Sequence, residues 1–453
     1  MKKIIVLILV LATALSVIAC NNTPPATSGK TDPVETPAET PAETPDETPA
    51  ETPEETPAET KDEAKLDSPI DLLGIKVVIP AEADRHVKYA ADSFINGVRI
   101  LTKAAVSLGT AEQEIELLIG NTGRPESETL KATLGEDEFA VKLIGKKLVV
   151  VATDDAFLHE AVGVLLDFMK IEDNAEAAEG KLTLKRAIDV KQAGDKTTYL
   201  YLFSKSDLIS AKGKLYNTFT PPTKDIRTTQ GGCIANGYYY QGYIQHDGGN
   251  QDNNKVIVVK YDFEKKTKVA QSEILKLQHC NDITYNAELD LIAVVNNGAN
   301  TNNMITFLDP DTLEVVEAKR IISDIYSLTY NYERNNYMTG LSGGQDLRRW
   351  DSEFGYDPSM KRIPATPKTA SYVTQGIGSD ENFIYCALYD YKNLGTSKYQ
   401  NVITVYDWYG NFIGIININV TQIEPENISI VDGTIYVTCH DKTGAKMFKM
   451  EVQ

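Results

Sequence analysis

Short β-rich runs separated by polar turns recur along the C-terminal half of the chain. Residues 278–297 show the pattern, with an apolar run at 283–285, a polar turn at 286–290 and a second apolar run at 291–295. Runs of this length with turn residues between them predict one β-hairpin of a larger sheet. The same layout predicts further hairpins that turn at residues 236–237, 333–336, 379–382 and 432–433.

The predicted hairpins repeat at a nearly constant spacing. The first apolar residues of the copies are Ile234, Ile283, Leu328, Ile377 and Ile428. Their period is about 45 to 51 residues, and most copies continue into a third β-rich run. A fixed period with several short strands per unit is typical of a β-propeller, since each small sheet buries its faces only against its neighbours. We therefore expect an all-β propeller over residues 197–453, with five blades favoured over six.

A strand from the start of this region is expected to close the ring. Residues 197–203 alternate polar and apolar side chains, which is typical of a strand. The last repeat, residues 427–453, has room for about three strands, so the earlier run would supply its outer strand. Closure of this kind removes open sheet edges.

Residues 68–192 carry a mixed pattern that predicts a small α/β sandwich domain before the propeller. The predicted element order is β-α-β-β-β-α-β. The strands are expected at residues 75–79, 115–119, 138–144, 147–151 and 182–184, and the helices at 83–105 and 156–169. Asp154 is expected to cap the second helix.

Several stretches of this domain resemble a known family. They read Leu118-Ile119-Gly120-Asn121-Thr122, Phe139-Ala140-Val141, Lys147-Leu148-Val149-Val150-Val151 and His159-Glu160-Ala161-Val162. They are similar to the small accessory domain that precedes the catalytic barrel in family 20 hexosaminidases and family 67 glucuronidases. The resemblance implies a supporting domain of carbohydrate-enzyme type. No catalytic residue carries over, because those families hold theirs in the barrel.

Two stretches of the β-rich half resemble the helveticin-type bacteriocin family. They are residues 230–240, Gln-Gly-x-x-Ile-Ala-Asn-Gly-Tyr-Tyr-Tyr, and residues 279–286, His-x-Asn-Asp-Ile-Thr-Tyr-Asn. The resemblance implies an extracellular β-propeller that acts at a cell surface.

Residues 1–20 have the layout of a processing segment. Two lysines precede an apolar run at residues 4–12, and residues 17–20 read Val-Ile-Ala-Cys. The segment resembles a bacterial lipoprotein signal peptide, which implies lipidation of Cys20 and a chain anchored in the cell membrane, facing outside. An ordinary secretory signal with an incidental cysteine is the alternative.

The formal net charge of the 453 residues is −19. A nucleic-acid-binding protein needs a basic footprint, so no nucleic-acid partner is expected. Part of the negative charge falls in residues 21–67, where acidic Glu-Thr-Pro-Ala units predict a disordered linker. The remaining cysteines have no C-x-x-C spacing, so we expect buried free thiols, with one disulfide as the alternative. They are Cys233, Cys280, Cys386 and Cys439.

Blade topology narrows the candidate ligand site. In an antiparallel blade, the start of the first strand and the loop after the second strand lie at the same end. The ligand-binding residues expected there are Gln230, His246, Asp247, His279, Asn281, Asp282, Gln375, Tyr391, Asn427 and His440. Amides, imidazoles and a tyrosine suit a hydroxyl-rich ligand, through hydrogen bonds and ring stacking. Structural roles for the same side chains, such as capping of strand entrances, stay open.

The chain shows no motif for a nucleophile elbow, a phosphate loop, a metal site or a cofactor, so neither metal nor cofactor is expected. A glycosidase or lyase needs two carboxyl groups about 5 to 9 Å apart, and no sequence spacing singles out such a pair. The sequence favours a non-catalytic surface lipoprotein that binds glycans or another cell-wall ligand through the propeller face. The alternatives are an extracellular polysaccharide hydrolase or lyase with carboxylates at the channel, and a bacteriocin-like or protein-interaction propeller.

Overall fold

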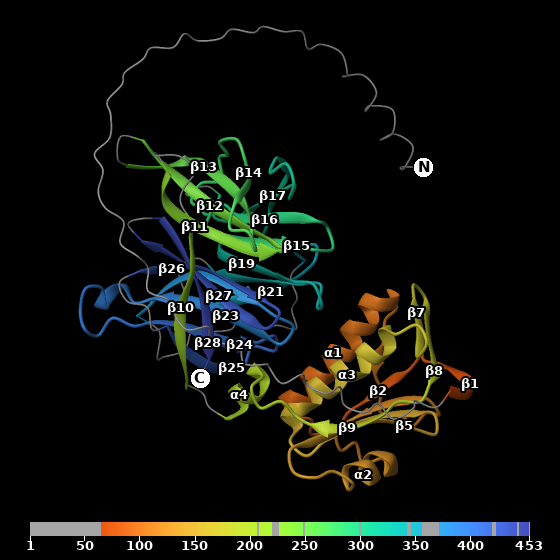
Figure 1. Cartoon of the computed structure of the whole chain (residues 1–453). Coiled ribbons are helices and arrows are strands. Elements are labelled where there is room, and N and C mark those ends of the chain that lie inside the picture. The colour runs from red at the N-terminus through yellow and green to blue at the C-terminus, as the bar shows by residue number, and fades with distance from the viewer. Residues whose placement is uncertain are drawn as a thin grey trace, which may run out of the picture. The chain divides into compact units, whose positions relative to one another are not determined.

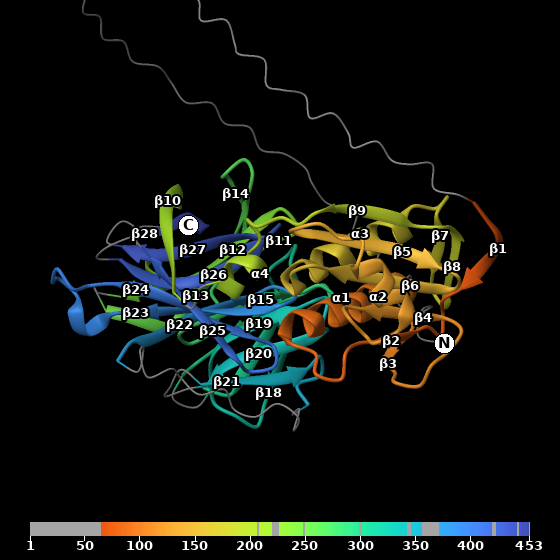
Figure 2. The same ribbon diagram turned by 90° about the horizontal axis from the view of Figure 1, so that it is seen from below.

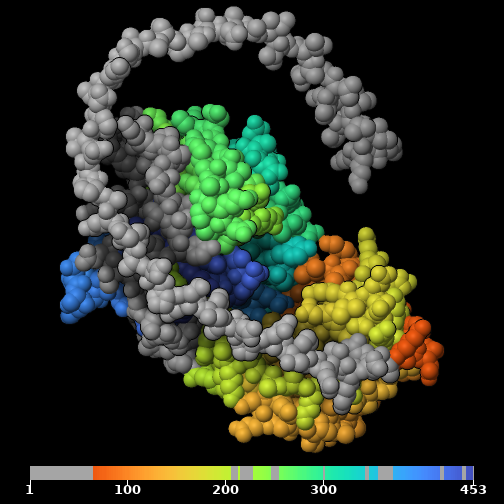
Figure 3. Space-filling model, in the orientation of Figure 1, coloured from red at the N-terminus to blue at the C-terminus, as the bar shows by residue number. Residues whose placement is uncertain are grey.

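The computed structural model describes two regions with different architectures, shown as ribbons in Figure 1 and as space-filling surfaces in Figure 3. The α/β region comprises residues 65–205, and the all-β region comprises residues 208–452. The described ranges are 65–205, 208–219, 226–247, 250–298, 301–341, 346–355, 371–418, 423–441 and 444–452. Within these ranges, every helix is too short or too polar to cross a membrane.

The predicted signal segment lies outside the described residues, as does the predicted linker up to residue 64. Residues 65–67, which the sequence placed in the linker, open the first strand, β1 (Lys65–Asp71).

The α/β region is built on a six-stranded sheet with the order β3-β2-β4-β6-β5-β9. Its strands are β2 (Lys76–Val78), β3 (Ser107–Leu108), β4 (Glu116–Ile119), β5 (Glu138–Ile144), β6 (Lys147–Ala152) and β9 (Asp189–Ala193). The first four in this order pair in parallel, and β5 pairs antiparallel to both β6 and β9. A smaller antiparallel sheet joins β1 to β8 (Lys181–Arg186) and β7 (Ala175–Ala178).

Helices α1 (Arg85–Thr102) and α3 (Leu158–Lys170) lie side by side in this region (Figure 2). Helix α1 begins where the Asp84 carboxylate accepts a hydrogen bond from the Val87 N–H at 3.0 Å. The Asp154 carboxylate accepts a hydrogen bond from the Ala156 N–H, as expected of a cap, and opens a 3₁₀ turn (Asp155–Phe157) that leads into α3. The remaining helices are α2 (Pro125–Lys131) and α4 (Tyr199–Lys205).

Helix α4 corrects the prediction that residues 197–203 form a strand. Leu200 and Phe203, three residues apart, share a helix face and are buried in a cluster with Tyr89 and Phe383. The Thr198 hydroxyl accepts a hydrogen bond from the Tyr201 N–H at 3.3 Å, which is a helix-start interaction that the alternating pattern concealed. Tertiary burial of one helical face therefore prevails over the two-residue period.

Strand β10 (Leu208–Phe219), which follows α4, takes the position expected of residues 197–203. It pairs in parallel with β25 (Phe412–Ile418) and antiparallel with β28 (Gly444–Val452). An N-terminal strand thus does join the C-terminal sheet, but it begins after the run that the sequence suggested.

In the described part of the chain, the all-β region has three small antiparallel sheets and one eight-stranded sheet in which only the β10–β25 pair is parallel. They follow the orders β11-β12-β13-β14, β15-β16-β17-β18, β19-β20-β21 and β22-β23-β24-β25, and the last continues through β10 into β28-β27-β26. The remaining strands of the first half are β11 (Ile226–Ala235), β12 (Tyr238–Asp247), β13 (Asn250–Asp262), β14 (Lys268–Gln271), β15 (Asp282–Asn286), β16 (Leu291–Val295), β17 (Met304–Leu308) and β18 (Val315–Arg320). Those of the second half are β19 (Ile325–Asn331), β20 (Asn336–Leu341), β21 (Leu347–Asp351), β22 (Val373–Ser379), β23 (Phe383–Tyr389), β24 (Asn401–Asp407), β26 (Glu424–Val431) and β27 (Thr434–Asp441).

The first strand of each hairpin repeat contacts the first strands of two other repeats. Strand β11 contacts β15, β15 contacts β19, β19 contacts β22, β22 contacts β26, and β26 contacts β11. These five strands are referred to below as the inner strands, and the space that they surround as the axis. The all-β architecture is compatible with the predicted β-propeller.

The predicted buried thiols are confirmed for the four described cysteines. Cys233, Cys280, Cys386 and Cys439 are free and buried. Burial raises the pKa of the Cys386 thiol to about 12, so that thiol stays protonated at neutral pH.

Candidate ligand-binding cavity

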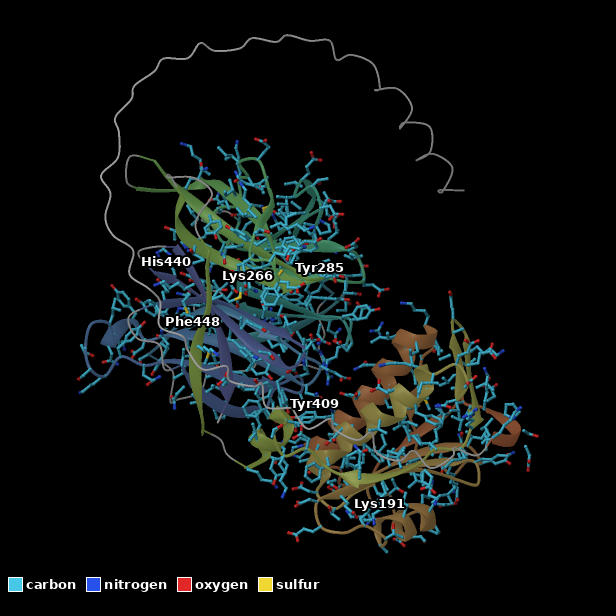
Figure 4. The ribbon with its side chains drawn as sticks, in the orientation of Figure 1. Lys191, Lys266, Tyr285, Tyr409, His440 and Phe448 are labelled. Atoms are coloured by element: carbon cyan, nitrogen blue, oxygen red, sulfur yellow. The ribbon has the colours of Figure 1, made fainter. Side chains whose placement is uncertain are left out.

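A cavity of about 490 Å³ lies on the axis of the all-β region. All five inner strands contribute to its wall, and the α/β region adds His159 from helix α3. The wall carries many hydroxyl groups, which belong to Thr284, Tyr285, Thr329, Tyr330, Tyr332, Ser379 and Ser429. Tyr285 is labelled in Figure 4.

Several of these hydroxyls also connect neighbouring inner strands. The Ser429 hydroxyl accepts a hydrogen bond from a backbone N–H of β11 at 3.1 Å, and the Thr284 hydroxyl accepts one from β19 at 3.0 Å. The hydroxyls of Thr329 and Ser379 lie 3.0 Å apart, between β19 and β22. The cavity wall is therefore polar and held in place by its own side chains.

Three polar side chains meet where the cavity reaches the α/β region. The Nε2 atom of His159 lies 3.1 Å from the Glu381 Oε2 atom and 3.1 Å from the Asn382 Nδ2 atom. One ring nitrogen cannot donate to the carboxylate and accept from the amide at once, so the tautomer of His159 decides which bond forms. The two regions thus build one site, within a compact unit of residues 60–453.

Glu381 is held as a carboxylate by its neighbours. The Ser93 hydroxyl donates to its Oε2 atom at 3.1 Å, and the Arg334 side chain donates to its backbone oxygen. Burial by itself would raise the pKa of Glu381, but the hydrogen bond from His159 and the charges of His159 and Arg334 lower it. A negative charge is therefore expected at this end of the cavity near neutral pH.

Glu333, on the neighbouring hairpin turn, behaves in the opposite way. Burial raises its pKa, and the charges of Glu381 and Asp380 raise it further. The backbone oxygens of Tyr332 and Glu333 accept hydrogen bonds from the Arg99 guanidinium at 2.8 and 2.9 Å, so helix α1 fixes this turn. The cavity consequently combines an ionised carboxylate with a carboxyl group that keeps its proton to higher pH.

Further contacts hold the α/β region against the hairpin turns. The Tyr89 hydroxyl donates to the Asp407 Oδ2 atom at 3.0 Å in a buried setting. Arg334 forms an ion pair with Asp92 at 2.9 Å, and the Tyr409 hydroxyl donates to the same carboxylate. Tyr409 is labelled in Figure 4. These contacts keep His159 at the cavity.

The other end of the axis is filled by backbone and by one aspartate. The Asp282 carboxylate is fully buried and accepts hydrogen bonds from the backbone N–H groups of Ile283, Leu328 and Ile377 at 2.9 to 3.0 Å. A Cβ atom on Gly231 would lie 2.3 Å from the Asp282 Cα atom. Asp282 therefore joins three inner strands, and a glycine lets the fourth approach.

Five of the residues predicted to bind a ligand cluster at this packed end. Gln230, Asn281, Asp282, Gln375 and Asn427 are at most 7% exposed. The Gln230 amide donates to the backbone oxygen of the preceding residue at 2.9 Å, and the Gln375 amide donates to the carboxylate of Glu424. The structure brings these five together as packed groups, and their role in ligand binding stays a prediction.

The other predicted residues lie farther along the same end. The Nδ1 atom of His440, a residue labelled in Figure 4, accepts a hydrogen bond from the Thr229 N–H at 3.4 Å. His279 is partly buried, and burial lowers the pKa of its imidazole. Tyr391 is 64% exposed on the loop after β23. His246 and Asp247 end strand β12, and their side chains lie outside the described residues.

Carboxyl groups gather at the packed end as well. Burial raises the pKa of Glu426 well above its ordinary value, and the charges of Glu424 and Asp282 add to the rise. Among the described residues, no group of three or more His, Cys, Asp or Glu side chains is placed to hold a metal ion.

Sequence reasoning predicted no functional role for His159, Glu333 or Glu381. The two glutamates occupy predicted hairpin turns, where polar residues are ordinary. The recurrence of carboxylates in turns at the same end of successive hairpins, at Glu333, Asp380, Glu381 and Asp432, is the signal that marks this end of the axis.

Comparisons with known proteins do not assign the chain to a family. No family model matches it, and no curated protein matches it. Among solved structures it is similar to Kuenenia stuttgartiensis hydrazine synthase, with 10% identity and a TM-score of 0.30. That match covers 49% of this chain and 59% of the other chain. A likeness this weak carries no argument about fold or function.

Proposed function

We propose that this protein is a lipid-anchored extracytoplasmic protein that binds a hydroxyl-rich ligand, a glycan, in its axial cavity without turning it over. The anchoring and the location rest on the lipoprotein-like segment that ends at Cys20. The observation that carries the binding proposal is the wall of the 490 Å³ cavity, where hydroxyls from successive inner strands meet the Glu381 carboxylate and His159. Such groups both donate and accept hydrogen bonds, as sugar hydroxyls require.

The proposal includes a five-bladed propeller as the scaffold. The cyclic contacts of the five inner strands support five blades. The pairing of β10 with β28 supports closure by an N-terminal strand in the sheet that ends the chain. In this arrangement the cavity lies at the end of the central channel that faces the α/β region.

A glycan array tests the binding proposal. The chain from residue 20 onward, carrying Cys20→Ser so that no lipid is added, is incubated on polysaccharide and cell-wall glycans. Retention and released reducing sugar are scored together. We expect retention of specific glycans without release.

Two matched substitutions in one hairpin turn locate the binding site. Ala287 lines the cavity and is exposed, so Ala287→Trp fills the entrance and is expected to weaken retention by about tenfold or more. Leu289 is 47% exposed and does not line the cavity, so Leu289→Trp should leave retention unchanged. Equal retention by both variants would exclude the cavity, and loss of retention in Tyr391→Ala would then favour the face predicted from the sequence.

A second candidate function is a polysaccharide hydrolase or lyase that uses the same cavity. The opposite pKa directions of Glu333 and Glu381 favour it, since a proton donor and an ionised carboxylate are the two groups that glycoside cleavage needs. Release of reducing sugar that disappears in both Glu333→Gln and Glu381→Gln would replace the binding proposal with this one.

A further inference from the structure

A second hollow of about 200 Å³ adjoins the axial cavity on its α/β side. Glu333 and Glu381 line both spaces, so the two are neighbours across these side chains. The rest of its wall comes from helices α1 and α3, through Ser93, Gly97, Ile100, Leu101, Leu166 and Lys170. It is referred to below as the helix groove.

The helix groove differs from the cavity in its chemistry. Its central wall is hydrocarbon, from Ile100, Leu101 and Leu166. Its polar lining residues are Ser93, Glu333, Glu381 and Lys170. The Ser93 hydroxyl donates a hydrogen bond to Glu381, which the groove shares with the cavity, and the Lys170 ammonium pairs with Asp167 at 2.7 Å. An apolar groove thus continues from a polar cavity.

The helix groove also continues away from the cavity. A third hollow of about 280 Å³ shares Leu101 and Lys170 with it and is lined further by Met169, Glu172, Ala175, Glu176 and Ala177. Three hollows with shared walls therefore run from the axis of the all-β region along helix α3. An elongated ligand fits this sequence of spaces better than a compact one does.

We propose that the helix groove binds the aliphatic part of an amphipathic ligand whose hydroxyl-rich part occupies the axial cavity. The inference rests on the proposed glycan binding and narrows the ligand class to a glycan or polyol that carries an alkyl or acyl chain. A hydrocarbon chain in this groove leaves water and contacts Ile100, Leu101 and Leu166. Sugar hydroxyls in the same place would lose their hydrogen bonds to water and gain none from these side chains.

Matched glycosides test the inference. Methyl and hexyl glycosides of glucose, galactose, mannose and N-acetylglucosamine share a head group and differ only in chain length. Their dissociation constants are measured by calorimetry with the chain from residue 20 onward carrying Cys20→Ser. We expect the hexyl form of the preferred sugar to bind at least about tenfold more tightly than its methyl form, because several methylene groups are buried.

Two substitutions at one position assign that advantage to the groove. Ile100 is partly buried on α1, and Ile100→Glu places a charge in the groove, whereas Ile100→Trp fills it with apolar volume. Both variants should lose the hexyl advantage and keep the affinity for the methyl glycoside. The control, Ile322→Glu, changes a side chain that is 78% exposed on the all-β region, and it should keep both affinities. Thermal unfolding checks that each variant is folded.

The outcomes separate the inference from the function on which it rests. If methyl and hexyl glycosides bound equally well, the helix groove would not bind the aliphatic part of the ligand, and the proposed glycan binding would still stand. If both folded Ile100 variants still bound the hexyl glycoside more tightly than the methyl glycoside, the hexyl chain would bind outside the helix groove, and the inference would be wrong. If neither glycoside binds and the glycan array is also blank, the proposed function fails and the inference fails with it.

Discussion

The two ends of the axis are built from the same five inner strands, yet one end is packed and the other is open. At the packed end, backbone approaches backbone: a Cβ atom on Gly376 would lie 2.4 Å from the Glu426 carbonyl oxygen, and one on Gly231 would lie 2.3 Å from the Asp282 Cα atom. At the open end, hydroxyl side chains stand between the strands and surround about 490 Å³. Glycines bring inner strands together at both ends, since a Cβ atom on Gly378 in the cavity wall would lie 2.6 Å from the Ile428 carbonyl oxygen. The ends differ in that the buried Asp282 carboxylate occupies the packed end, whereas hydroxyl side chains line a cavity at the open end.

The two ends also differ in the direction in which they shift the pKa of their carboxyl groups. Glu381 at the open end has His159 and Arg334 beside it, and its pKa is lowered. At the packed end burial raises the pKa of Glu426, and the charges of Glu424 and Asp282 raise it further. The open end therefore keeps an ionised carboxylate near neutral pH, whereas the packed end is most stable when the Glu426 carboxyl group carries a proton.

Removing the acceptor at the packed end should have the largest effect. Asp282→Ala leaves three buried backbone N–H groups without an acceptor and should lower the free energy of unfolding by about 3 to 5 kcal/mol, measured by urea unfolding. Asp282→Asn keeps one oxygen and should cost less. An unchanged unfolding midpoint in Asp282→Ala would show that Asp282 does not hold the axis closed.

Adding one methyl group at the same end should have the next largest effect. Gly231→Ala forces the new Cβ atom against the backbone of Asp282 and should cost about 2 to 3 kcal/mol of unfolding free energy. Gly163→Ala is the matched control, because Gly163 lies in helix α3 with no atom within 4 Å of the added Cβ. The control should stabilise the protein by about 0.5 to 1 kcal/mol, and equal effects of both substitutions would contradict the tight approach.

The free energy of unfolding, measured as a function of pH, tests the raised pKa of Glu426 at the packed end. Since the folded pKa of Glu426 lies above the ordinary value of 4.5, the native state binds the extra proton, and stability declines as pH rises above that value through the folded pKa. Glu426→Gln cannot lose a proton. Urea unfolding should show the variant more stable than the wild type at pH 8 and nearly equal to it at pH 4. Parallel pH profiles would contradict a raised pKa.

The smallest effect on stability is expected at the open end. Thr284→Val keeps the side-chain shape but removes the acceptor of the Tyr330 N–H, at a cost of about 1 kcal/mol in urea unfolding. Glycan retention should fall as well, because the hydroxyl lines the cavity. Thr110→Val, on the exposed surface of the α/β region, is the control and should change neither quantity. If Thr284→Val lowered the free energy of unfolding but retained the glycan fully, the Thr284 hydroxyl would not take part in ligand binding.

Local sequence signals predicted most hairpins of the all-β region. Asn236-Gly237 and Asp432-Gly433 both turn with positive φ at each residue, as two-residue hairpin turns require. The aligned residues Ile283, Leu328 and Ile377 all supply the backbone N–H groups that meet Asp282, so the repeat was placed in the correct register. These features depend on a few adjacent residues, and sequence reasoning is strongest there.

The cavity could not be predicted from the sequence, because its site is formed by contacts between residues far apart in the chain. His159 belongs to a helix of the α/β region and Glu381 to a turn of the all-β region, and only the docking of the two regions brings them together. Blade topology and polar residue types predicted the opposite end, but the burial of polar groups at an axis cannot be read from topology or residue type alone. Helix α4 could not be predicted for the same reason. Leu200 and Phe203 pack in a cluster with residues far away in the sequence, and the local polar–apolar alternation does not reveal that packing.

The pairing of β10 with β28 also means that the sheet containing β10 can be completed only after residues 444–452 have been synthesised. Strand β10 is synthesised before the other strands of the all-β region, but one of its two neighbours, β28, is the last described strand. Until residues 444–452 arrive, β10 has an edge that another chain can pair with. A message cut short just before these residues would therefore release a chain with nearly all its strands and one unprotected edge.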